Sequence, residues 1–308
     1  MSDKSRNSRF TRKSGKNGPT GPHSKDSKRL GAASQRRSQG SRAHGAGSSP
    51  KSPKNRSIST KRKGSGHEGG SGWHWGAHAC TAILANPRRT IHEILLTEHS
   101  AGRYELPKGT ISPTIVLPNI IDKVTGRDAA HQGIAIKAAP LEWPDLETLA
   151  DTQEDGLILV LDQITDPHNV GAMLRLCSAF GVRALVMQTR KAPPLSGALA
   201  KVAVGCLETV PVCLETNIAN TLQNLQRIGW MVTGLAGETE MEIKDAVSGG
   251  GKHVIVMGAE GPGLRERVRK TCDQLAKIPM MSGNAAGEAE SLNVATAAGI
   301  ALYEARRG

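Results

Sequence analysis

From residue 156 onward, short apolar runs alternate with segments whose apolar residues recur at helical spacing. The run LILVL at 157–161 is apolar at every position, which is typical of a strand covered on both faces. Further strands are predicted at 183–187, 230–234, 253–257 and 275–278, and helices at 170–180, 196–203, 217–227, 264–271 and 292–306. This alternation predicts an α/β fold with a mostly parallel sheet and helices on both of its faces. Ligands of such sheets bind beyond the carboxyl ends of the strands.

The segment 73–140 predicts a smaller α/β unit. Its pattern favours a helix at 77–84 and strands at 91–96, 115–117 and 134–136. The acidic segment 141–155 contains Pro144 and reads as a linker with about one helical turn. The predicted division is therefore a tail at 1–72, a small domain at 73–140, a linker at 141–155 and a larger domain at 156–308.

Residues 1–72 have neither periodicity nor an apolar core. They hold 18 Lys and Arg against three acids, which leaves 22 of the 40 basic and 25 of the 28 acidic residues for 73–308. Because so little apolar surface is available to offset chain entropy, we expect a disordered basic tail. Three interpretations stay open: an arm that neutralises nucleic-acid phosphates, a solubilising tail, and an organelle transit peptide.

Composition narrows the class of protein. The chain of 308 residues has no apolar run of the about 18 to 20 residues that a membrane helix needs, so no membrane association is expected. The five cysteines include no CxxC pair, which argues against a disulfide framework or a cysteine-built metal site and favours a reducing, cytoplasmic setting. No secretory signal is expected, because the N-terminus lacks an apolar segment.

Three loops that follow predicted strands carry candidate chemistry. After 157–161, the loop 162–169 ends at Asn169, which is placed to cap the next helix, and Arg175 is the one basic residue of that apolar helix. A lone arginine there could also pair structurally. After 253–257, the sequence GAEGPG at 258–263 allows close backbone approach to a ligand, and Glu260 is an acid at a strand tip. It matches neither a P-loop nor GxGxxG.

The third loop begins at Ile278-Pro279-Met280 and ends in the sequence SLNV at 291–294, which opens the last predicted helix. Ser291 is a plausible N-cap of that helix. Asn293 has poor helix propensity, so a role for its side chain is favoured there.

Together, N-x-G-A-x-x-R, G-A-E-G-x-G and I-P-M…S-L-N-V in this order resemble the SpoU/TrmH family of RNA ribose 2′-O-methyltransferases, within the SPOUT class. The likeness covers about 157–306. The segments around Trp75 and at 131–133 (HQG) resemble the family's RNA-binding N-terminal domain. The layout is most similar to the branch that methylates a guanosine of 23S rRNA.

The resemblance implies a parallel sheet with a C-terminal trefoil knot, a homodimer, and S-adenosylmethionine held by Gly258, Ile278 and Leu292. No metal is implied. The polar residues of the family's motifs fall on Asn169, Arg175, Glu260, Ser291 and Asn293. The loop between Pro279 and Ser291 is longer than in the family pattern.

A ribose hydroxyl is a poor nucleophile, whereas a sulfonium methyl group is a good electrophile. The family proposal makes the arginine, here Arg175, the group that deprotonates the hydroxyl. Since a guanidinium pKa exceeds about 12, we expect Arg175 to bind a phosphate and stabilise the alkoxide, with the proton acceptor left open. Asn169 and Ser291 would hold the ribose or Arg175, Glu260 would pair with Asn169 or Arg175, and Asn293 would shape the site.

Alternatives stay open at this point. The RNA substrate is rRNA in the favoured interpretation and tRNA in the second. A non-catalytic RNA-binding or ribosome-assembly protein could retain the same fold. A nucleotide-cofactor oxidoreductase is disfavoured because GxGxxG is missing.

Overall fold

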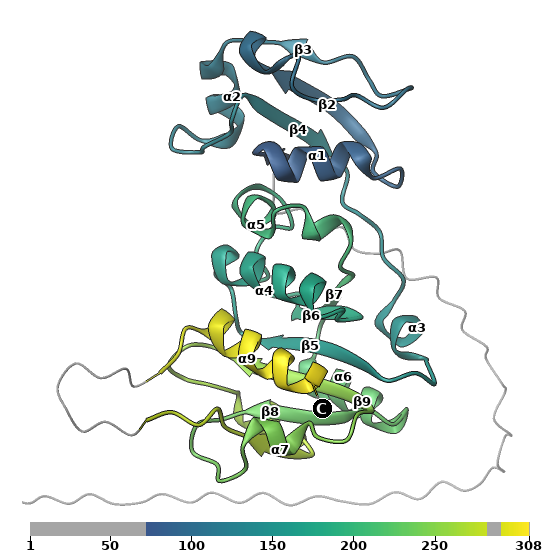
Figure 1. Ribbon diagram of the computed structural model, residues 1–308, viewed down its shortest axis with the longest axis vertical. Coiled ribbons are helices and arrows are strands. Elements are labelled where there is room, and N and C mark those ends of the chain that lie inside the picture. The colour runs from purple at the N-terminus through teal and green to yellow at the C-terminus, as the bar shows by residue number, and fades with distance from the viewer. Residues whose placement is uncertain (1–71, 282–290, 308) are drawn as a thin grey trace, which may run out of the picture. The chain divides into compact units, whose positions relative to one another are not determined.

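The computed structural model describes residues 72–281 and 291–307, which form two sheets with their covering helices (Figure 1). The basic segment 1–71 lies outside the described residues, and so does the loop 282–290. The expectation of a disordered tail is therefore not tested by the fold.

The larger sheet has six parallel strands in the order β10-β8-β9-β5-β6-β7. Their bounds are β5 Gly156–Asp162, β6 Ala184–Gln188, β7 Val212–Glu215, β8 Met231–Leu235, β9 Lys252–Gly258 and β10 Gln274–Ala276. The predicted parallel sheet is confirmed. Strand β9 lies between β8 and β5, so the loops after β5 and β9 leave from neighbouring strands at one edge.

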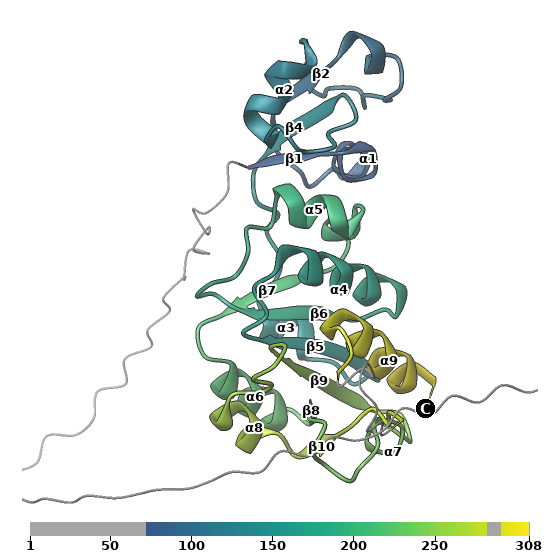
Figure 2. The same cartoon turned by 90° about the vertical axis from the view of Figure 1, so that its left-hand side faces the viewer.

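Helices cover both faces of this sheet, with α4 and α9 on one side and α6 and α8 on the other (Figure 2). Alternate residues of β5 explain why both faces need cover: Leu157, Leu159 and Leu161 enter one core cluster, and Ile158 and Val160 enter the other. The first cluster is completed by α4 Pro167–Ala179, α5 Gly197–Ala203, α7 Ile243–Ala246 and α9 Val294–Arg307, and the second by α3 Leu146–Ala150, α6 Ile218–Arg227 and α8 Glu266–Thr271.

The smaller sheet is mixed and has the order β1-β4-β2-β3. Its strands are β1 Trp73–Trp75, β2 Ile91–Leu96, β3 Thr114–Ile115 and β4 Ile134–Ala138, and only the β2–β3 pair is parallel. Helix α1 Ala77–Ala85 contributes to the core on one face, and α2 Pro118–Thr125 contributes to the core on the other. Two short 3₁₀ helices lie at η1 Glu98–Ser100 and η2 Cys206–Glu208.

The structure adds elements that periodicity did not predict, namely β1, β7, α2 and α7, all of eight residues or fewer. It also moves the start of α4. The helix begins at Pro167, and the side chain of Asp166 caps it by accepting a hydrogen bond from the amide of His168 at 3.0 Å. Proline is favoured in the first helical turn and aspartate is a strong N-cap, so the expectation that Asn169 caps this helix is wrong.

A buried ion pair joins the chain around the smaller sheet to the chain around the larger one. Arg89 and Glu208 have side chains that are only 2% and 5% exposed, and the guanidinium contacts the carboxylate at 2.8 Å. Asn86 donates a further hydrogen bond to Glu208 at 2.8 Å, and Arg89 also donates to the carbonyl of Ala139. The extra hydrogen bonds matter because a buried charge is stable only when its polar atoms are satisfied.

Two expectations from composition concern the described part of the chain. No helix there is long and apolar enough to cross a membrane. All five cysteines are unpaired, and Cys80, Cys177 and Cys213 are buried.

His74 makes the stability of this fold dependent on pH. Its side chain is buried in β1, and burial, with Arg89 nearby, lowers the pKa of His74 from 6.5 to about 3. Between those values the unfolded chain binds a proton that the folded chain does not. The free energy of unfolding should therefore fall by about 3 kcal/mol between pH 7 and pH 4 on account of this residue.

Chemical denaturation at several pH values would measure this dependence. His74→Leu should flatten the slope between pH 4 and pH 6.5, whereas His92→Leu, which changes an exposed histidine of β2, should not. An unchanged slope in His74→Leu would contradict the assignment.

Candidate active site at the carboxyl edge of the larger sheet

The three candidate loops start or end at one edge of the larger sheet. The last residue of β5, Asp162, lies opposite the last residue of β9, Gly258, so the loops after these strands are neighbours. The third loop connects the end of β10 to the start of α9. All the described candidates lie on these segments: Asn169, Arg175, Gly258, Glu260, Ile278, Ser291, Leu292 and Asn293.

The glycine-rich loop after β9 folds back on itself. Ala259 and Gly263 form an isolated antiparallel bridge, with amide-to-carbonyl distances of 3.2 and 2.9 Å. A Cβ atom at Gly258 would lie 2.3 Å from the backbone carbon of Gly263, which is closer than real Cβ contacts allow. Glycine is therefore required at 258 by close backbone packing, and at 261 and 263 by positive φ angles of 85° and 67°.

Asp162 holds this loop to the sheet. Its side chain is fully buried, and one carboxylate oxygen accepts from Nε of Arg265 at 2.7 Å and contacts Nη2 at 2.5 Å. The other oxygen accepts from the backbone amide of Arg265 at 2.9 Å. A carboxylate with three charge-assisted contacts to one residue fixes both the position and the direction of the chain that leaves the loop.

The sequence analysis did not identify Asp162 and Arg265. It applied the argument for a buried acid to Glu260, whereas the buried acid is Asp162. An acid at a strand tip needs a partner if it is buried. Glu260 is instead exposed and has no hydrogen bond or ion pair with any described residue, so its expected pairing with Asn169 or Arg175 is not found. The available signal was that Asp162 directly follows five apolar residues of a buried strand.

The first and third loops meet through two asparagines. Asn293 donates from Nδ2 to Oδ1 of Asn169 at 3.1 Å. Its own Oδ1 accepts from the amides of Ala295 and Thr296, at 2.9 and 3.3 Å, and so caps α9. The expectation that Ser291 caps this helix is wrong, because α9 begins at Val294 and Ser291 is too far from it.

This pairing determines what Asn169 can offer a ligand. The oxygen of Asn293 must accept from the helix amides, so its nitrogen must donate to the oxygen of Asn169. The nitrogen of Asn169 is then left with two N–H donors, and no described residue accepts from it. These donors suit a ribose oxygen or a phosphate.

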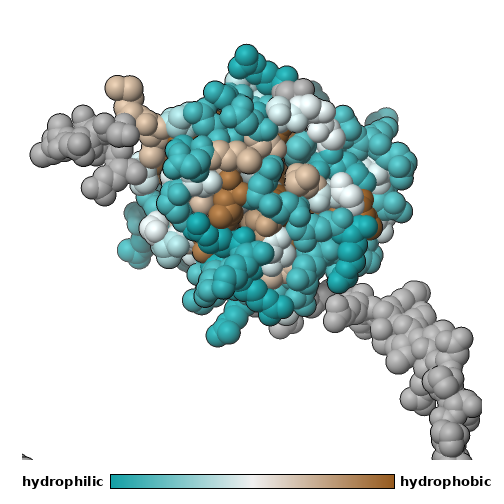
Figure 3. Space-filling view, turned by 90° about the horizontal axis from the view of Figure 1, so that it is seen from below, coloured by the Kyte–Doolittle hydropathy of each residue, from teal (hydrophilic) through white to brown (hydrophobic). Residues whose placement is uncertain are grey.

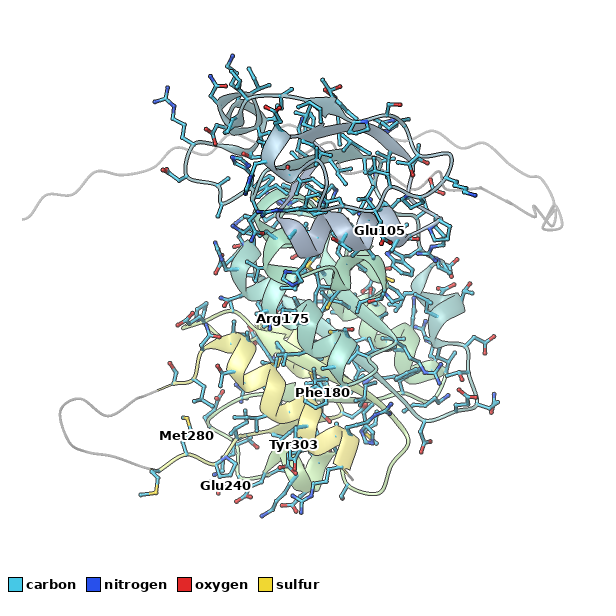
Figure 4. The ribbon with its side chains drawn as sticks, turned by 45° about the horizontal axis from the view of Figure 1, so that its top comes forward. Glu105, Arg175, Phe180, Glu240, Met280 and Tyr303 are labelled. Carbon is cyan, nitrogen blue, oxygen red and sulfur yellow. The ribbon has the colours of Figure 1, made fainter. Side chains whose placement is uncertain are left out.

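Arg175 lies on α4, two turns after the start of the helix, and its side chain is exposed (Figure 4). It forms no ion pair or hydrogen bond with another described residue, unlike Arg89 and Arg265. The structural alternative for this arginine, pairing within the protein, is therefore absent from the described residues. Its five N–H donors remain available to an external anion.

Gly258, Ile278 and Leu292 are the positions expected from the resemblance to contact the cofactor. The space that a side chain at Gly258 would fill is taken by the backbone of Gly263 and Leu264, so the glycine closes the turn on itself. Ile278 and Leu292 are half-buried, and Ile278 packs against the core of the larger sheet. Within the described residues, no three histidine, cysteine or acidic side chains are grouped to hold a metal ion.

Comparison with known proteins identifies the fold and the family. Residues 156–303 match the model of the SpoU rRNA Methylase family, and residues 74–144 match the model for RNA 2′-O ribose methyltransferase substrate binding. A 23S rRNA (guanosine-2′-O-)-methyltransferase RlmB of Vibrio vulnificus (strain CMCP6) is 40% identical over 243 residues, which cover 76% of this chain and 95% of the relative. The chain belongs to the SpoU rRNA methylase family. It is an RNA ribose 2′-O-methyltransferase that uses S-adenosylmethionine.

Other relatives agree with this family. The RlmB enzyme of Pseudomonas putida is 38% identical over 246 residues and covers 76% of this chain and 95% of its own length. Among solved structures, the SpoU methyltransferase AviRb from Streptomyces viridochromogenes, in complex with the cofactor AdoMet, has a TM-score of 0.61 at 22% identity, covering 76% of this chain and 89% of that one. At that identity, the likeness shows the shared fold.

Removing the charge of Asp162 should disturb this SpoU family site as well as the fold. Asp162→Asn leaves the guanidinium of Arg265 without its counter-charge, and we expect the free energy of unfolding to fall by about 2 to 3 kcal/mol. The affinity for S-adenosylmethionine should fall with it, because the glycine-rich loop loses its anchor.

Glu266→Gln is the matched control, since Glu266 pairs with Lys270 on an exposed helix surface and the pair should contribute less than about 0.5 kcal/mol. Denaturant unfolding and calorimetric titration would measure both quantities. Equal effects of the two substitutions would contradict the assigned role of Asp162.

Proposed function

We propose that this enzyme methylates the ribose 2′-hydroxyl of a guanosine in 23S rRNA. The observation that carries the proposal is 40% identity over 95% of the length of an enzyme named for that reaction. The contact between Asn169 and Asn293 supports it, because two motif segments that are 124 positions apart meet side chain to side chain. We further propose that the reaction takes place in the cytoplasm, where the substrate would be found.

The reaction needs a methyl group, a deprotonated oxygen and an in-line arrangement of the two. S-Adenosylmethionine supplies the electrophilic methyl group when it is bound at Gly258, Ile278 and Leu292. The protein must hold the ribose against that position and stabilise the negative charge that develops on its oxygen.

Arg175 is the group we assign to that charge. Its guanidinium has no partner among the described residues, so it can grip the phosphate next to the ribose at two points and place positive charge near the reacting oxygen. The two N–H donors of Asn169 would orient the ribose. The proton leaves to water, or to a guanidine nitrogen if Arg175 is neutral at that step. Ser291 and Glu260 are exposed and would act on the RNA or on the loop around it.

The remaining parts of the proposal concern assembly. We propose a homodimer and a C-terminal trefoil knot, as in the family that the motifs resemble, and the four-part division at 72, 140 and 155. Exposed apolar side chains near α9 support a dimer: Met241, Met280 and Tyr303 are 42%, 46% and 52% exposed. Figure 3, which views the molecule from below, shows apolar surface among the hydrophilic residues of that face. The charge of 1–72 supports a role in non-specific RNA binding.

Transfer of labelled methyl groups to separate 23S rRNA and tRNA transcripts tests the substrate directly. We expect incorporation into 23S rRNA at one guanosine, with 2′-O-methylation mapped by its resistance to alkaline cleavage. Incorporation into tRNA alone would contradict 23S rRNA as the substrate and favour tRNA. Binding of S-adenosylmethionine without transfer to any RNA would favour the non-catalytic alternative.

Substitution of Arg175 tests the mechanism. Arg175→Ala should lower kcat at least about 100-fold, while the protein still folds and binds S-adenosylmethionine, because an exposed side chain contributes little to stability. Arg175→Lys keeps the charge but loses the planar fork, so a clamp role predicts slow transfer at every pH. A steep recovery of the Arg175→Lys rate as pH rises would instead indicate proton abstraction, and a near-normal rate in Arg175→Ala would contradict both roles.

A further inference from the structure

A second candidate site lies in the smaller sheet, away from the methyl-transfer site. A hollow of about 860 Å³ opens where β2 and β3 end and β4 begins. We call it the 97–133 hollow, and the residues that carry the argument are Thr97, Arg103, Val116, Leu117, His131 and Gln132. It falls within 74–144, the range of the substrate-binding family model, which does not say where on the domain RNA would bind.

The hollow has a fixed frame. The hydroxyl of Ser100 is buried and lies 2.6 Å from the carbonyl oxygen of Gly133 and 2.9 Å from that of Thr97. Gly133 has φ +81°, and a Cβ atom there would lie 2.6 Å from Oγ1 of Thr97. Gln132 also has a positive φ, 57°, and its Oε1 accepts from the amide of Ala77 at 2.8 Å. A strained turn held this firmly is pre-organised, which lowers the ordering cost of binding.

One wall of the hollow is apolar and exposed. Leu117 is 70% exposed, and it lies between Val116 and Pro118, the first residue of α2. Ile115, next to this segment, is 51% exposed. An aliphatic shelf of this kind can cover the apolar face of an unstacked base and remove it from water, and unstacked bases are the parts of single-stranded RNA that proteins bind.

Other residues that line the hollow supply charge and hydrogen-bonding groups. Nη2 of Arg103 lies 2.6 Å from Nε2 of His99, so the exposed guanidinium is held at the rim rather than free in solution. Glu98 also lines the hollow and offsets part of that charge. A site with one held cation, one acid and an apolar shelf fits one phosphate with its base better than it fits a long stretch of backbone.

We propose that the 97–133 hollow binds a single unpaired nucleotide of the RNA substrate, with its base on Leu117 and Val116 and its phosphate on Arg103. This rests on the proposed function. The turn that frames the hollow is tied to the larger sheet's helices, because Nζ of Lys201 on α5 donates to the carbonyl of Ala130 at 2.9 Å. A nucleotide held here would set the register of the RNA relative to the site of methyl transfer.

The apolar contact of Leu117 and the phosphate contact of Arg103 should differ in how they depend on salt concentration. Leu117→Ala should raise the KM for 23S rRNA transcript about 5-fold at every salt concentration, because it removes an apolar contact. Arg103→Gln should raise KM and also reduce the slope of log Kd against log salt by about 0.7 to 1, because one phosphate contact is lost. In both variants kcat and the affinity for S-adenosylmethionine should stay unchanged.

Leu117→Trp provides a positive test, because a larger flat surface should bind the transcript at least as tightly as the wild type. Ile228→Ala and Arg227→Gln are matched controls, since these exposed residues lie at the end of α6 on the larger sheet. Their KM values should stay within about twofold of wild type, because surface substitutions of this kind rarely alter a distant site.

The outcomes for the subsite and for the proposed function are distinct. If the wild type does not methylate 23S rRNA, the proposed function fails. If it does, and Leu117→Ala and Arg103→Gln match their controls in KM and salt slope, the subsite is wrong. Loss of binding in Leu117→Trp would also overturn it, provided that the thermal unfolding midpoint of that variant is unchanged.

Discussion

The contact between Asp162 and Arg265 is the constraint on which the site depends. A fully buried carboxylate at the end of the central strand β5 has one partner among the described residues, Arg265, which is the second residue after the glycine-rich segment 258–263. Without it, the charge would have to be solvated in a place that water does not reach. The ion pair therefore forces the chain to turn back at Gly258, where no side chain could be accommodated. The geometry of the glycine-rich loop follows from the electrostatics of the strand beside it.

Asn293 connects a second pair of segments, α4 and the start of α9, through hydrogen bonds at both ends of its amide. One end of its amide satisfies the free N–H groups at the start of α9, and the other end fixes Asn169 on α4. One side chain thus caps α9 and holds the amide of Asn169 in one direction. A residue that would only cap the helix, such as serine, could not present Asn169 in a defined direction, because a hydroxyl group has one donor and no fixed second arm.

The sequence predicted those features of this enzyme that depend on residues close together along the chain. The run at 157–161 could only be a strand buried on both faces, and the order of three motifs indicated the family. Contacts between distant segments were not accessible in this way. Asp162 was treated as the start of a loop, and its burial depends on a partner 103 positions away. The cap of α4 was placed on Asn169 because its helical spacing begins at Val170, whereas Asp166 and Pro167 start the helix one turn earlier. The short strand β1, three residues long, has too few positions to show a period.

The buried pair of Arg89 and Glu208 bears on how this family could have been assembled from parts. The two family models divide the chain into a substrate-binding segment and a methylase segment, as though either could be exchanged for another. The methylase segment, however, carries an acid that is 8% exposed and takes its counter-charge from Arg89 in the other segment. A methylase segment inherited alone would keep that acid without its cation. Exchange of substrate-binding segments during evolution would then require either a replacement arginine at the same place or the loss of Glu208.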